Sequence, residues 1–298
     1  MNPVRLNAKR KTEAISTITP ASPKNGEATV FLFLVGFVIG GNPPVWGLQL
    51  VLLAAAVIFT GRAAAISRIP VFEGRQNESA GFFSGLNTVV GNKPMAGFSL
   101  YFFLLNLTAF GTVPLMMLYL KNGLNAPDNV IVLISACSLS GMLFGYLCIG
   151  RLLKRIGMKH TFLLLHFIFF AVNGGLFLIG GRSMATYLLI AFFLLVYSFA
   201  AAASSIVASA EMMKLASSGN KIMAMAFNGA FFYGGSGLSR FLTSLLLGSG
   251  MFAAEWQLGA TTVCRYRTFL LLYCAAILLA APFLLLVPAV NSGKSNKP

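Results

Sequence analysis

Charged residues are scarce in this chain. Of its 298 residues, 10% are Asp, Glu, Lys or Arg, whereas 57% are hydrophobic. A soluble domain of this length needs more charge on its surface. Acidic residues are the rarest, with seven Asp and Glu against 22 Lys and Arg, so the net charge is +15. The composition excludes an ordinary soluble domain and indicates a membrane protein.

Cysteine and histidine are also rare. The four cysteines have no paired spacing, and a thiol inside an apolar run behaves as a small hydrophobe. They are Cys137, Cys148, Cys264 and Cys274. The two histidines, His160 and His166, are too few for a metal cluster inside a membrane. We therefore expect no disulfide framework, no metal site and no cofactor.

The basic residues do not gather on one face. They lie in the gaps between apolar runs, without interleaved aromatic residues, so we expect no nucleic-acid partner. A membrane protein explains the basic excess without a ligand, because Lys and Arg concentrate in cytoplasmic loops. The lipid bilayer is therefore the expected partner.

The first apolar run covers residues 28–61 and carries no charge. At ~1.5 Å per residue it is too long for one crossing of a ~30 Å core and short for two. Its middle, Gly40 to Pro44, contains Pro-Pro, which cannot continue a preceding helix. We expect a helical hairpin over 28–66, preceded by a flexible cytoplasmic tail over 1–27.

Six further apolar runs follow, each of about 20 residues or more, which is enough to cross a membrane. They cover 95–120, 129–152, 160–181, 184–210, 221–248 and 267–290. Most connections are short, so neighbouring helices should be antiparallel. With the hairpin, the sequence predicts an all-α polytopic membrane protein of about eight transmembrane helices, with a six-helix bundle over 95–290.

Two polar segments flank this bundle. Residues 67–94 are mixed in charge and are expected to form a cytoplasmic loop, and residues 291–298 a cytoplasmic C-terminal tail. Within the loop, apolar residues at three- and four-residue spacing predict an amphipathic helix on the membrane surface. These residues are Phe82, Phe83, Leu86 and Val89.

A basic segment, Gly145 to His160, joins two of the runs. It packs four cations into nine residues: Arg151, Lys154, Arg155 and Lys159. A basic segment between two apolar runs is typical of a short cytoplasmic loop. Gly150 and Gly157 bracket the expected turn, where a tight link needs bare backbone.

The pattern Gly-x-x-x-x-Arg-x-Gly-x-Lys resembles the cytoplasmic loop signature of the major facilitator superfamily (MFS). It is formed by Gly150, Arg155, Gly157 and Lys159. In that family the second copy of the loop lies between helices eight and nine of twelve. The resemblance implies that 28–290 correspond to family helices five to twelve, with 67–94 as the central loop and the first four helices absent.

One position departs from the family pattern. Lys154 stands where the family has an Asp, whose carboxylate helps to cap a helix and pairs with arginines at the inner gate. A helix N-terminus stabilises an anion and does not stabilise a lysine. Glu211, beside another cytoplasmic loop, could supply a carboxylate to Arg155 or Lys159; alternatively it is a solvated loop charge.

Polar residues inside apolar runs are the candidates for substrate binding. Arg240 lies about 28 Å along a helix that begins at Lys221. We expect Arg240 to snorkel to the outer surface, and an anion contact in a cavity is the alternative. Asn106, Asn228 and Tyr233 lie on runs that the resemblance implies line the cavity, where each binds a substrate or a neighbouring helix.

Small residues gather on the fourth and fifth of the six runs. They are Ala200–Ala203, Ser204, Ser205, Ala208 and Ala210, and then Gly229, Gly234, Gly235, Gly237 and Gly248. Small side chains let helices approach closely in lipid, so we expect both groups to be packing faces.

The resemblance implies transport of a small solute by alternating access, with binding near the membrane midplane. Alternating access needs two helical bundles that move against each other, and this chain is expected to contain one complete bundle. Three alternatives follow: an incomplete product without activity, a subunit that pairs with a separate N-terminal half, or a homodimer. We expect no uptake by the isolated chain. The alternative function is a non-transporting scaffold or receptor on a degenerate transporter fold.

An intramembrane serine protease is a remote third hypothesis. Gly234 to Gly237 matches the GxSG of rhomboid proteases, but such a serine needs a histidine base on a nearby helix. His166 lies two helices before the serine, whereas rhomboids place their histidine after it. We therefore expect no enzyme activity.

The basic residues also predict the orientation. In the eight-helix arrangement, 17 of the 22 Lys and Arg lie on one side, four on the other, and Arg240 on neither. The four are Lys121, Arg182, Arg265 and Arg267. The positive-inside rule then places both termini in the cytoplasm, most simply in the plasma (inner) membrane.

Overall fold

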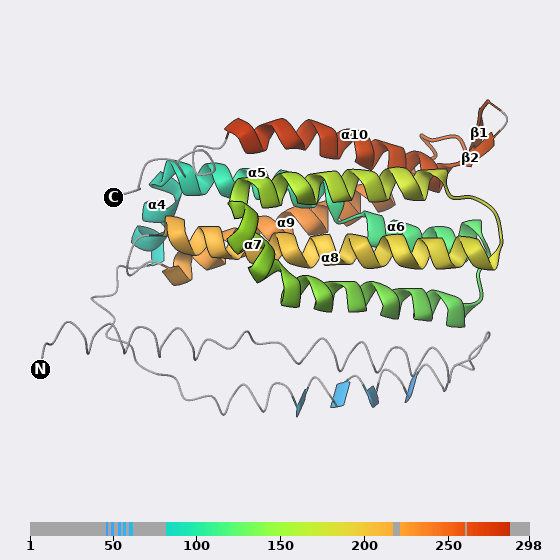
Figure 1. The fold of residues 1–298 in the computed structure, drawn as a ribbon, viewed down its shortest axis with the longest axis horizontal. Helices are drawn as coiled ribbons and strands as arrows, with labels where there is room; N and C mark the ends of the chain where they lie inside the picture. Colours follow the sequence, from blue (N-terminus) through green and yellow to red (C-terminus); the bar gives the residue numbers. More distant parts are fainter. Residues whose placement is uncertain are drawn as a thin grey trace, which may run out of the picture.

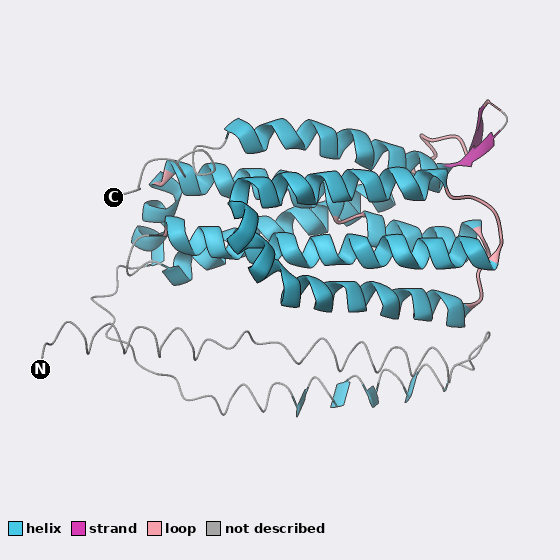
Figure 2. Cartoon of the chain, viewed as in Figure 1, coloured by secondary structure: helices cyan, strands magenta, loops and turns pink. Residues whose placement is uncertain are grey.

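The computed structural model describes three main segments. These are residues 82–216, 221–259 and 261–286, with scattered positions between 46 and 61. The two expected tails lie outside the described residues, and so does the hairpin over 28–66 apart from those scattered positions. The described part of the chain is almost entirely helical, as Figure 2 shows.

The helices follow the apolar runs and lie side by side in an elongated bundle (Figure 1). Helix α4 (Phe82–Gly91) precedes the bundle and covers the segment predicted to be amphipathic. The six runs form α5 (Lys93–Ala109), α6 (Thr112–Leu118) with the π-helix η1 (Tyr119–Gly123), α7 (Asp128–Leu178), α8 (Met184–Leu215), α9 (Lys221–Gly248) and α10 (Arg265–Leu286). The all-α class is therefore confirmed for the described residues, apart from one small hairpin.

That hairpin is the element that the sequence analysis missed. Strands β1 (Glu255–Leu258) and β2 (Thr261–Cys264) pair antiparallel between α9 and α10. The Trp256 indole donates a hydrogen bond to the Thr268 hydroxyl at 2.7 Å, which ties the hairpin to the first turn of α10. The hairpin thus lies at one end of the bundle, beside the start of α10 (Figure 2).

Helix α7 is two helices that meet at Gly157. Its 51 residues would extend about 76 Å if they were straight. Instead the chain reverses at Gly157, so a first arm (128–156) and a second arm (158–178) run in opposite directions (Figure 1). Gly157 has φ 74° and ψ 171°, a region that glycine alone adopts readily. The predicted glycine turn is confirmed at Gly157. Gly150 lies inside the helix, so the prediction for Gly150 is wrong.

We expect Gly157→Val to lower the thermal stability of the purified protein by several degrees. A β-branched residue at this backbone conformation costs about 1–3 kcal/mol. The matched control is Gly150→Val, because a side chain at Gly150 would meet no atom within 4 Å. The melting temperatures of both variants in detergent test this, and equal values would contradict a conformational role for Gly157.

The first arm of α7 approaches α8 so closely that no side chain fits between their backbones. A Cβ atom on Gly141 would lie 2.0 Å from the carbonyl oxygen of Leu195. A Cβ on Gly145 would lie 2.5 Å from the carbonyl oxygen of Phe199. Two glycines four residues apart are the usual device for such an approach. This packing pair was not predicted from the sequence.

The small residues of α8 and α9 behave differently. On α8 most of the predicted packing face is buried: Ala200, Ala203 and Ala208 are fully enclosed, whereas Ala201, Ser205 and Ala210 are half-buried. On α9 one glycine has a close backbone contact: a Cβ on Gly235 would lie 2.7 Å from the carbonyl oxygen of Phe103. A Cβ on Gly237 would meet no atom within 4 Å. The prediction of a packing face is therefore confirmed for the enclosed residues of α8, and on α9 the close backbone contact is at Gly235.

Four helices in the described residues are long and apolar enough to cross a membrane. They are Lys93–Gly123, Asp128–Leu178, Met184–Leu215 and Arg265–Leu284. The expected count of about eight is not reached. Two expected crossings lie in 28–66, mostly outside the described residues. Two more are the two arms of α7, which count here as one helix. Helix α9 is less apolar than the others, because it contains several glycines and polar residues. Four such helices are compatible with insertion into a membrane.

Candidate functional site

A cavity of about 490 Å³ lies between four of the helical runs. Its walls come from Phe110 between α5 and α6, from α6, the first arm of α7, α8 and α9, while the second arm of α7 and α10 do not contribute. Cavities of this volume accommodate small organic molecules. Most lining side chains are half-buried, so the cavity opens toward one side of the described bundle.

A break between α5 and α6 shapes the first wall. Pro114 has no backbone N–H and its ring conflicts with the carbonyl four residues earlier, so the helix cannot run continuously past Phe110. The break leaves the carbonyl of Ala109 at the end of α5, and the buried Tyr197 hydroxyl of α8 donates a hydrogen bond to it. Phe110 lines the cavity and packs against Phe232 of α9, with ring centroids 5.3 Å apart.

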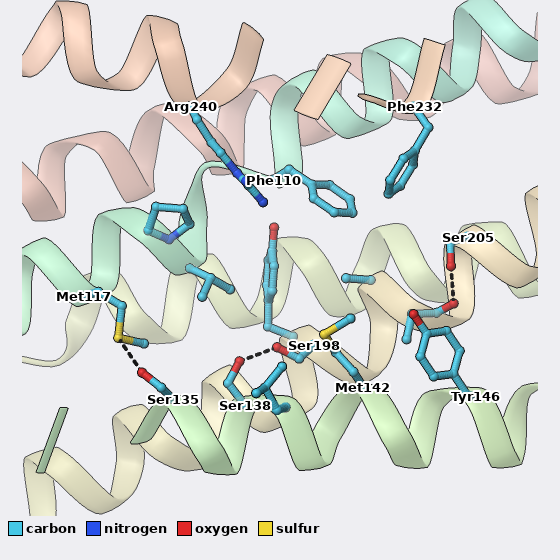
Figure 3. A pocket seen from close by; sticks show the side chains of 16 residues that line it. Phe110, Met117, Ser135, Ser138, Met142, Tyr146, Ser198, Ser205, Phe232 and Arg240 are labelled. Atoms are coloured by element: carbon cyan, nitrogen blue, oxygen red, sulfur yellow. Dashed lines mark hydrogen bonds between the residues drawn. The ribbon is translucent and has the colours of Figure 1, made fainter. Parts of the chain in front are cut away.

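Hydroxyl groups line the opposite wall. Ser138 of α7 and Ser198 of α8 are hydrogen-bonded at 2.6 Å, and Ser135 donates to the carbonyl of Ile131 at 2.8 Å. The Ser205 hydroxyl donates to the carbonyl of Ala202 at 2.8 Å. Figure 3 shows Ser135, Ser138 and Ser198 together on one side of the cavity and Ser205 apart from them.

This wall was not predicted, although the spacing of its lining residues can be seen in the sequence. Ser135, Ser138, Met142 and Tyr146 recur at three- and four-residue intervals within an apolar run, which places them on one face of a helix. Polar side chains on one face of an otherwise apolar helix are the signal that would have found them.

Arg240 is the one charged side chain among the lining residues that the structure describes. Its guanidinium extends from α9 into the cavity near Phe110 (Figure 3). It makes no hydrogen bond or ion pair with the described residues, and its side chain is exposed. The structure therefore places Arg240 at a cavity, as the alternative interpretation of an anion contact requires.

The other three candidates lie away from the cavity wall. Asn106 is fully buried where α5 meets α9, and its amide donates to the carbonyl of Phe102 at 2.5 Å. Asn228 is also buried, and the side-chain oxygens of Asn106 and Asn228 have no partner among the described residues. Tyr233 is 73% exposed. The structure thus brings Arg240, but not these three, to the cavity.

The turn around Gly157, which carries the sequence resemblance, lies toward the end of the bundle opposite the strands (Figure 1). Lys154 and Arg155 are exposed there. Glu211 is buried, and its carboxylate pairs with Lys214 at 3.1 Å. Arg155 forms no ion pair within the described part of the chain, so Glu211 does not replace the missing family carboxylate for Arg155.

The residues of the protease hypothesis are not assembled. The Ser236 hydroxyl donates to the carbonyl of Tyr233 at 3.2 Å. The His166 ring stacks on Tyr101, with centroids 5.8 Å apart, and its Nδ1 lies 2.9 Å from the carbonyl oxygen of Phe162. Neither group is placed to activate the other.

The comparisons with known proteins add no assignment. No protein-family model matches the chain, and no curated protein matches it in sequence. Within the described segments there is also no group of three or more His, Cys, Asp or Glu that could hold a metal ion. Inferences about function therefore start from the cavity.

Proposed function

We propose that this protein is the substrate-binding half of an alternating-access carrier for a small solute, similar to the C-terminal part of an MFS transporter. The position of the cavity is the observation that carries the proposal. The first, second, fourth and fifth of the six runs line it, and the third and sixth do not. This division of helices is what a bundle needs if one face binds a solute and the other packs outward.

A second body completes the carrier in this proposal. The cavity wall is half-buried, so a solute bound there alone would stay open to one side. A second copy of the chain or a separate N-terminal half would cover this side and rock against it. The lipid bilayer of the plasma membrane surrounds both bodies, and the end that carries the loop around Gly157 faces the cytoplasm.

Cysteine accessibility tests this function without knowledge of the solute. In the full chain with its native cysteines replaced, we expect Leu139→Cys and Ser205→Cys to react with a membrane-impermeant thiol reagent from both sides. Both residues line the cavity. Alternating access exposes the cavity to each side in turn, and intact cells and inverted vesicles give the two measurements.

Three reference positions make the result interpretable. Asn122→Cys, at the end with the strands, should react only from outside, and Lys154→Cys only from inside, because both side chains are exposed at opposite ends. Phe192→Cys, on the outward face of α8, should react from neither side. Reaction of both cavity positions from a single side would instead identify a receptor or scaffold.

A further inference from the structure

We propose that the cavity binds an organic anion with a single negative charge, and that Arg240 contacts the anionic group. The rest of this solute is apolar and flat, as in an aromatic acid. This inference rests on the proposed function, because it takes the cavity as the solute site. It names the chemical class of the solute, which neither the cavity volume nor the family resemblance provides.

The first argument is the charge balance around Arg240. The described residues contain three carboxylates: Asp128, Glu211 and Glu255. Asp128 pairs with Lys121, Glu211 pairs with Lys214, and Glu255 lies on β1 at the end of the bundle. None lines the cavity. The Arg240 guanidinium thus reaches the cavity without a carboxylate partner among the described residues, and a solute anion would supply one.

The second argument is the number of cations. One arginine balances one negative charge, and its planar fork matches a carboxylate with two parallel hydrogen bonds. The second charge of a dianion would meet apolar side chains such as Val113, Leu139 and Met142 instead of a cation. The cavity therefore favours a monoanion over a dianion.

The third argument concerns the rest of the solute. Phe110 and Phe232 form an edge-to-face pair on the wall nearest Arg240, which suits a flat apolar body. The Ser135 hydroxyl donates to a backbone carbonyl, and one of the Ser138 and Ser198 hydroxyls donates to the other. The remaining lining side chains are mostly apolar, so the wall favours a solute with few polar groups over a sugar-like solute with many hydroxyls.

Binding to the purified full chain in nanodiscs tests the class. The probe is tritium-labelled 2-naphthoate in equilibrium dialysis, with competition by benzoate and hexanoate, by the three matched neutral amides, and by the dianion terephthalate. We expect the monocarboxylates to compete at least tenfold better than their amides or terephthalate. Loss of a charge-assisted hydrogen-bonded pair has an effect of about this size or larger.

Two variants assign the anion to Arg240. Arg240→Gln should weaken 2-naphthoate binding at least tenfold, whereas Arg240→Lys should weaken it less, because it keeps the charge and loses the fork. Arg182→Gln is the matched control, since Arg182 is exposed in the loop before α8. Its binding should equal that of the unmodified protein.

Three results would overturn the anion class: no monocarboxylate binds, the amides bind as tightly as the acids, or Arg240→Gln binds like the unmodified chain. These failures are distinct from failure of the carrier function. If the amides bind as tightly as the acids and the cavity cysteines still react from both sides, the carrier function is supported and the anionic solute class is rejected. If the acids bind and the cysteines react from one side, the anion site belongs to a receptor.

Discussion

Gly141→Leu is expected to prevent the bundle from assembling in its native packing. A side chain at this position would meet the backbone of α8, 2.0 Å from the Leu195 carbonyl oxygen, and backbone cannot rotate aside as a side chain can. Overpacking typically costs about 1–3 kcal/mol, and a clash with backbone belongs at or above the upper end. The measurement is the fraction of monodisperse protein recovered in detergent, together with its melting temperature.

The control for this change is a glycine of the same arm with open space around it. Gly150→Leu, on the same arm, introduces the same side chain where no atom lies within 4 Å, so it should change the melting temperature little. Gly141→Ala should fall between the two. Equal recovery of Gly141→Leu and Gly150→Leu would show that the two helices do not meet at Gly141.

The same contact holds one wall of the cavity together. Ser138, one turn before Gly141, is hydrogen-bonded to Ser198, one turn after Leu195. Displacement of α8 from the first arm would therefore separate these two serines and widen the cavity. The close approach of the two helices is a condition for the shape of the proposed solute site.

Arg267→Ala is expected to destabilise the end of the bundle that carries the strands. The guanidinium is buried and donates to the carbonyl of Phe177 at 2.7 Å and to that of Thr262 at 3.3 Å. It thereby joins the last turn of α7 to strand β2. Loss of hydrogen bonds from a charged donor leaves these carbonyls unsatisfied and costs roughly 3 kcal/mol. A fall in the melting temperature and faster proteolysis near the strands are the measurements.

Arg265→Ala is the matched control for this position. Arg265 is half-buried, and its guanidinium lies 5.6 Å from the ring of its neighbour Tyr266. Removal of this cation–π contact should lower the free energy of unfolding by less than ~1 kcal/mol. Equal loss of stability in both variants would contradict the role of Arg267 as a link between α7 and the hairpin. From the sequence both arginines are expected to be charges of an outer loop, and only the structure distinguishes them.

The positions of the helices could be predicted because they depend on local composition. Apolar runs of sufficient length must satisfy their backbone internally, which makes them helices whatever they pack against. Gly157 was also predictable, since a reversal between two such runs needs a backbone conformation that side chains oppose. The number of crossings was less predictable, because α9 mixes apolar residues with glycine, serine and Arg240.

The candidate site could be predicted only in part. Asn106, Asn228 and Tyr233 were chosen as polar residues within apolar runs, but polarity does not indicate which face of a helix meets a cavity. Asn106 and Asn228 are buried, Tyr233 is exposed, and none lines the cavity. Arg240 is a polar residue of the same kind, and the structure places it at the cavity.

The sequence by itself determined the helical class, the turn at Gly157 and the separation of basic residues between the ends, because each follows from the side chains of one segment. The tertiary structure alone decided the approach of Gly141 to Leu195, the burial of Arg267 and the cavity that Arg240 enters. These features depend on which residues of distant segments meet, and that depends on the rotation of each helix about its axis. Helix rotation is fixed by packing between neighbours, which no single segment specifies.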